Sequence, residues 1–135
     1  MKKNTIIYWV STGLFALLML FNAYSYIAKP EMVAAFKHLG FPDYFRLELA
    51  AAKALGALLL IIPAIPARIK EWAYAGFGIT FISAAFAHFS SGDPATFVVV
   101  PIIFFIVLVV SYVFLHKKNK PAVAVINNNI KTSLA

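Results

Sequence analysis

Hydrophobic residues are arranged along this chain in four long runs, separated by short segments that hold most of the charged residues. A helix needs about 20 consecutive apolar residues to cross the hydrocarbon core of a bilayer, and each run approaches that length. The runs cover residues 6–27, 44–65, 72–89 and 97–115. The pattern predicts an all-α membrane protein, an antiparallel bundle of four transmembrane helices that forms a single domain over residues 1–116.

The composition also favours a membrane protein. Of the 135 residues, 62% are hydrophobic and 13% are charged, whereas about 25% of the residues of a soluble domain are charged. No second domain, internal repeat or nucleotide-binding motif is visible. Residues 117–135 have no core to join, so we expect them to form a mobile cytoplasmic tail.

The connection between the first two runs is the longest, and it carries helix signals of its own. Pro30 stands near its start and Gly40 near its end, as in the first turn and just after the last turn of a helix. Its apolar residues share one helical face: Met32, Val33, Phe36 and Leu39. We therefore expect a short amphipathic helix at the outer interface, between the first and second transmembrane helices.

Basic residues predict how the chain is oriented. One side of the membrane would receive most of them: Lys2, Lys3, Arg68, Lys70, Lys117, Lys118 and Lys120. On the other side, Lys29 and Lys37 are offset by Glu31 and Asp43. The positive-inside rule then places both termini in the cytoplasm, in a bacterial-type inner membrane. The net charge of +7 reflects this topology and an attraction to anionic membrane lipid, and does not indicate a nucleic-acid partner.

The N-terminal stretch MKKNTIIYWVSTGLFALLMLF also resembles a signal peptide, because two lysines precede an apolar run. Small residues follow the run, as they do at a cleavage site. The run is nevertheless longer than the about 7 to 15 residues of a signal sequence, which favours a retained transmembrane helix.

The second run contains two charged residues, Glu48 and Lys53. If the helix enters the membrane at Tyr44, the helical rise puts Lys53 about 13 Å deep, close to the midplane. An amine at that depth costs about 2.5 to 3.5 kcal/mol unless it faces the bundle interior, a water-filled cavity or a partner. Glu48 and Lys53 are about 140° apart around the helix, so each is expected to find partners on other helices.

Polar residues at a matching depth stand at the outer ends of the other runs. The first run ends with Asn22 and Tyr24, and the third ends near His88, followed by Asp93. We therefore predict a polar pocket in the outer half of the bundle, with these candidate ligand-binding residues: Asn22, Tyr24, Glu48, Lys53, His88 and Asp93. The inner half, including residues 107–110, is expected to pack through apolar side chains.

Each candidate also has a structural interpretation. Glu48 would pair with Lys29 or Lys37 at the interface, and Lys53 would extend outward as a charge that fixes the bundle. His88 would hydrogen bond a loop carbonyl. Small residues of the second run would serve close packing on the third, and tyrosines and tryptophans near the ends of runs would join the interfacial belts.

The absence of some residue types limits the cofactors that this chain could bind. Cysteine is absent, which excludes disulfides, thiolate metal sites and a dithiol relay. A haem held by two histidines needs both at comparable depth on facing helices, and only His88 is even partly inside, so such a haem is not expected. His38 and His116 lie at opposite surfaces and receive no role. No metal site is predicted, and a quinone is the cofactor that remains to be considered.

Four segments follow one another in an order and spacing typical of a known family. They are EMVAAFKHLGFPDYF, LAAAKALGALLLIIP, IKEWAYAGFGITFISAAFAH and SSGD. From residue 6 to residue 115 the chain resembles the DoxX-like family of small four-helix membrane proteins. The resemblance implies that Lys53, His88 and Asp93 occupy the family's polar motif positions. Its founding member is a membrane subunit of a thiosulfate:quinone oxidoreductase, and other members are linked to oxidative-stress complexes or to assembly of membrane partners.

Two functions remain in view. In one, the chain is the membrane subunit of a quinone-linked redox complex, with the quinone head near Lys53 and His88 and a proton relay through Glu48 or Asp93. In the other, it is a non-catalytic membrane subunit that stabilises or assembles a membrane or redox protein, or its own oligomer, and its buried charges fix helix register. The sequence contains no complete catalytic constellation, so we favour the second; small transporters and lipid binders are further alternatives.

Overall fold

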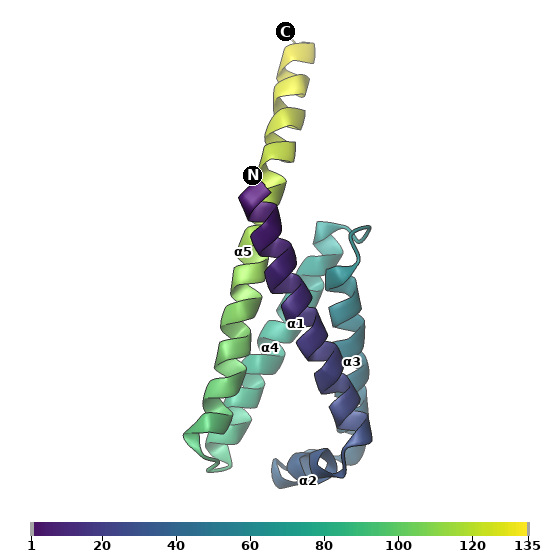
Figure 1. The fold of residues 1–135 in the computed structure, drawn as a ribbon, viewed down its shortest axis with the longest axis vertical. Helices are drawn as coiled ribbons and strands as arrows, with labels where there is room; N and C mark the ends of the chain where they lie inside the picture. Colours follow the sequence, from purple (N-terminus) through teal and green to yellow (C-terminus); the bar gives the residue numbers. More distant parts are fainter. Residues whose placement is uncertain (1, 135) are drawn as a thin grey trace.

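The computed structural model describes residues 2–134, and this part of the chain is all helical, as predicted. Its five helices are α1 (Lys2–Ala28), α2 (Pro30–His38), α3 (Asp43–Ile61), α4 (Ala67–Ser90) and α5 (Ala95–Leu134). The four long helices alternate in direction and pack against one another, with α1 contacting both α3 and α5 (Figure 1). The short helix α2 lies across the end of the bundle that is remote from the N-terminus.

Three of these helices are long and apolar enough to cross a membrane. They are α1, α4 and α5 over residues 95–119. The sequence predicted a fourth crossing at α3, whose 19 residues include Arg46, Glu48 and Lys53. These charges within so short a helix set α3 apart from the other three. Length and composition therefore identify an all-α membrane protein with three crossings in the described part of the chain, and a fourth crossing at α3 stays a prediction.

The short helix expected after the first run is present as α2. Pro30 lies in its first turn, and Gly40 follows it with a φ of 86°, a left-handed conformation that glycine adopts without strain. Phe36 is buried and packs edge-on against Tyr26, with the ring centroids 4.9 Å apart. Phe36 also faces Phe45 of α3. These aromatic contacts connect α2 to the end of α1 and the start of α3.

The last helix, α5, is longer than the fourth apolar run. It continues past residue 115 to Leu134, and its final part projects beyond the other helices (Figure 1). The segment expected to be a tail is therefore helical where it is described, and its mobility stays a prediction. Residue 135 lies outside the described residues.

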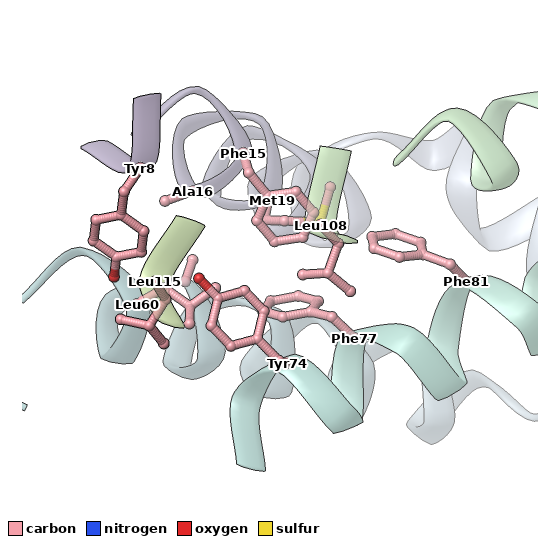
Figure 2. Packing of buried hydrophobic residues seen from close by; sticks show 11 residues of the cluster. Tyr8, Phe15, Ala16, Met19, Leu60, Tyr74, Phe77, Phe81, Leu108 and Leu115 are labelled. Atoms are coloured by element: carbon pink, nitrogen blue, oxygen red, sulfur yellow. The ribbon is translucent and has the colours of Figure 1, made fainter. Parts of the chain in front are cut away.

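Aromatic residues of α1 and α4 form the centre of the core. Phe15 lies edge-on to Phe77 and Phe81, with centroid distances of 5.0 and 5.8 Å (Figure 2). Gly56 of α3 lies directly against the Phe77 ring, and a Cβ atom there would come within 2.7 Å of it. The predicted close packing of α3 on α4 is thus observed at Gly56. It does not extend to every small residue of α3, because Ala51 falls on the exposed face.

Candidate functional site

Lys53 points into the interface between α1 and α3. Its side chain is nearly buried, with the residue 6% exposed. The amine donates hydrogen bonds to the Asn22 side-chain oxygen at 2.6 Å and to the Tyr26 hydroxyl at 2.7 Å. It also lies 4.3 Å from the centroid of the Tyr26 ring. Because the two acceptors are four residues apart, both stand on the α1 face that meets α3.

Arg46 is a second buried cation on α3, and it was not among the residues predicted from the sequence. Its guanidinium donates to the Asp43 carboxylate, with Nε 3.1 Å from the oxygen, and to the backbone carbonyl of Tyr26. That carbonyl belongs to the last turn of α1, whose carbonyls lack partners within the helix. Arg46 thus caps α1 from the neighbouring helix. The spacing of Asp43 and Arg46, three residues along a helix, was the available signal.

Asp93 bridges two histidines at the end of the bundle where α2 lies. One carboxylate oxygen is 2.6 Å from His88 Nδ1, and the other is 2.7 Å from His38 Nε2. Gly92, with a φ of 73°, turns the chain between His88 and Asp93. The pairing of His88 with Asp93 joins two predicted candidates. His38, which received no role from the sequence, completes the cluster and ties α2 to the connection between α4 and α5.

The pH dependence of stability should report on this bridge. Hydrogen bonds from His88 and then His38 hold the pKa of the Asp93 carboxyl below its usual value, because they stabilise the charged carboxylate. The stabilisation is complete above the unfolded pKa of about 3.9 and is lost as pH falls through the lower folded pKa. Asp93→Asn should therefore flatten the acid limb of a plot of melting temperature against pH.

The matched control for this prediction is Glu31→Gln, because Glu31 is an exposed acid of α2 with no hydrogen bond or ion pair in the described part of the chain. Glu31→Gln should keep the acid limb of the wild type. An acid limb that is the same in Asp93→Asn and in the wild type would contradict the bridge.

Two of the six predicted residues stand apart from these clusters. Tyr24 is 63% exposed and faces away from the bundle. Glu48 is also exposed, and in the described residues it makes neither a hydrogen bond nor an ion pair. The structure thus gathers Asn22 with Lys53 and His88 with Asp93, as two separate clusters. Two grooves in the structure are lined by other, mostly apolar residues.

The half of the bundle that contains the N-terminus, which the sequence predicted to be the inner half, is more polar than expected. Ser111 Oγ lies 2.6 Å from the Thr12 hydroxyl and 2.6 Å from the Tyr74 hydroxyl, and all three residues are buried. Lys70 is also buried, and its amine donates to the Tyr8 hydroxyl at 3.1 Å and to the Leu60 carbonyl at 3.0 Å. Single serines and threonines give no sequence signal here, because they can bond to the carbonyl of their own helix when no partner is near.

Most of these helices lie within a segment that matches a known protein family. The DoxX-like family profile matches residues 10–111, which is most of the chain. The chain belongs to the DoxX-like family. This DoxX-like match contains both clusters and ends within α5, so the projecting end of that helix lies outside it. No curated protein and no solved structure matches the chain. Family membership and the apolar helices together establish an integral membrane protein of the DoxX-like type.

No metal-binding arrangement occurs in the part of the chain that the structure describes, where histidine and carboxylate residues do not form a suitable group of three. The His38–Asp93–His88 cluster instead uses its central carboxylate as a bridge, with one oxygen directed at each ring. The chemistry that these clusters support is hydrogen bonding and charge compensation between helices.

Proposed function

We propose that this DoxX-like protein is a non-catalytic membrane subunit that stabilises or assembles another protein, which it binds through the projecting end of α5. The observation that carries the proposal is the set of large apolar side chains exposed there: Val125, Ile126, Ile130 and Leu134. Ile126, Ile130 and Leu134 recur every four residues and therefore share one helical face. An apolar helical face beyond the bundle is the kind of surface that a groove on a partner accommodates.

The buried cations support a structural role for the bundle itself. Lys53, Arg46 and Lys70 each donate to acceptors on a neighbouring segment of the same chain. Such contacts fix the register of the helices. They also give each of these cations a partner inside the chain.

The proposal includes four membrane crossings, with α3 as the fourth. The cost of placing α3 in a bilayer falls when Arg46 and Lys53 are hydrogen bonded inside the bundle. Both termini then lie on one side, and the basic residues beside α1 and at the start of α4 support placing that side in the cytoplasm, in a bacterial-type inner membrane. Because the chain has no cysteine, single cysteines are simple probes. Ser91→Cys and Asn128→Cys should be labelled from opposite sides, and labelling of both from one side would refute this topology.

Purification from native membranes followed by mass spectrometry tests the proposed role. The full chain should co-purify one specific membrane or redox protein in a fixed ratio. The double variant Ile126→Asn/Ile130→Asn should lose that protein, because it makes the apolar face polar. Asn128→Ala is the matched control, since it changes the opposite side of the same segment and should retain the partner. Identical co-purified proteins with the wild type and the double variant would rule out this role for α5.

A quinone-linked redox subunit is the second candidate function. One observation favours it: the Lys53 ammonium has three donors, and two of them bond Asn22 and Tyr26. The third is available for a quinone oxygen. His88 is engaged by Asp93, in the other cluster. If a quinone head binds there, it should co-purify with the wild type and be lost from Lys53→Met, whereas His88→Phe shows whether the histidine participates.

A further inference from the structure

An apolar groove runs between α1 and α5, in the half of the bundle that contains the N-terminus. It has a volume of about 490 Å³ and is lined on α1 by residues that include Ile6, Val10 and Leu14, and on α5 by Val107 and Val110. Ser11 also borders it, but its hydroxyl donates to the Ile7 carbonyl at 2.7 Å. The groove therefore offers hydrocarbon contact without a polar group that seeks a partner.

Lysines stand at one end of this groove. Lys117 follows Val110 by seven residues, so it lies on the α5 face that borders the groove, about 10 Å further along the helix. Lys3 precedes Val10 by seven residues and lies on the corresponding face of α1. The hydrogen bond between Thr12 and Ser111 fixes the antiparallel register of the two helices. The start of α1 is thus beside the part of α5 that follows Ser111, as Figure 1 shows.

Two further amines meet at the same end of the bundle, beside Tyr8 and Trp9. The Lys118 amine lies 4.9 Å from the centroid of the Tyr8 ring, and the Lys70 amine lies 5.6 Å from it. Both amines also approach Trp9, at 5.9 and 5.4 Å. Rings attract cations through their π face but do not neutralise them.

Carboxylates do not balance this charge. Glu71, the acidic residue of α4, lies 3.1 Å from His116. Among the described residues, no ion pair joins Lys3, Lys117 or Lys118 to an acid. The lysine end of the groove therefore carries an uncompensated positive charge next to an apolar surface.

We propose that the groove between α1 and α5 binds an anionic phospholipid, with an acyl chain against the apolar lining and the phosphate at Lys3, Lys117 and Lys118. An anionic headgroup supplies the negative charge that balances the lysines at this end of the groove, and the acyl chain of the lipid covers the apolar lining. A zwitterionic lipid fits less well, because its own cation already compensates its phosphate.

Tryptophan fluorescence provides a local test. The chain contains two tryptophans, so Trp72→Phe leaves Trp9, beside the lysines, as the sole reporter. The full chain carrying this substitution is reconstituted in phosphatidylcholine vesicles that contain increasing fractions of brominated phosphatidylglycerol or brominated phosphatidylcholine. Brominated phosphatidylglycerol should quench Trp9 fluorescence at a lower fraction than brominated phosphatidylcholine does. Raised salt should reduce this difference between the two lipids.

Substitutions of lysine test whether the preference for phosphatidylglycerol arises at the proposed site. Lys117→Gln and Lys118→Gln should each lower the preference for phosphatidylglycerol about fivefold. Lys29→Gln and Lys37→Gln, at the opposite end of the bundle, are matched controls that should leave it unchanged. Val110→Phe, which fills part of the groove, should reduce quenching by both lipids.

Three results would overturn the proposal. Equal quenching by the two brominated lipids would show that there is no preference for the anionic headgroup. A preference that survives Lys117→Gln and Lys118→Gln would place the lipid elsewhere. Loss of the preference on adding inorganic phosphate, at constant ionic strength, would identify a site for free phosphate rather than for lipid.

Discussion

Removing both acceptors of the Lys53 amine, through Asn22→Leu together with Tyr26→Phe, should lower the free energy of unfolding by about 3 kcal/mol. A hydrogen bond to a charged donor contributes about 1.5 to 3 kcal/mol, and the double variant removes two of them. The amine stays buried in the double variant and loses the oxygens that solvate it. The measurement is denaturant unfolding of the purified protein in detergent micelles.

A third substitution distinguishes two causes of the lost stability, namely the lost hydrogen bonds of the buried amine and poorer packing of α1. Adding Lys53→Met to Asn22→Leu/Tyr26→Phe should restore most of the stability, because an apolar side chain needs no acceptor. Tyr24→Phe is the control, since it makes the same chemical change at an exposed position of α1. A triple variant no more stable than the double variant would show that the buried charge is not the cause.

Gly56→Ala should destabilise the protein by about 1 to 3 kcal/mol. The added Cβ would stand 2.7 Å from Phe77 Cε2 and 2.9 Å from Cζ. The Phe77 ring has little room to move, because Phe15 meets it edge-on at 5.0 Å and Phe81 stacks beside it at 6.1 Å. Either the ring or the α3 backbone must therefore shift. The same unfolding measurement gives the magnitude.

Gly76→Ala is the matched control for this substitution. Gly76 lies within α4, and a Cβ there meets no atom within 4 Å. Its alanine variant should be as stable as the wild type or more so, because alanine favours a helix by about 0.5 to 1 kcal/mol over glycine. If the two alanine variants had equal stability, the close contact of α3 with Phe77 would not hold.

The sequence predicted the positions of the long helices well, because their apolar runs are directly visible. It also indicated that Lys53 must find partners inside the bundle, since an unpaired amine is costly in lipid. It identified Asn22 as a candidate of the same site, but it named Tyr24 as the tyrosine of that site and left Tyr26 in an interfacial belt. A tyrosine can either bond the Lys53 amine or join an interfacial belt, and the rotation of α1 about its axis decides which of these Tyr26 does.

The misses share a physical cause. Arg46, His38 and Ser111 take their roles from segments that lie far away in sequence, and hydrophobic periodicity carries no information about such pairs. Lys70 looked like a surface charge at the start of a helix, yet neighbouring helices cover it. The extent of α5 beyond its apolar run likewise could not follow from hydropathy, which marks where apolar residues end and not where a helix ends.

The connection of residues 62–66 between α3 and α4 divides the chain into two halves of similar length, and some of the polar contacts described above cross between them. Thr12 bonds Ser111, Lys70 bonds Tyr8, and Asp93 reaches His38. The halves are therefore held together by side chains at the centre of the bundle and at both of its ends. The short link is thus one of several connections between the halves, because α1 also packs on α5 and α3 on α4.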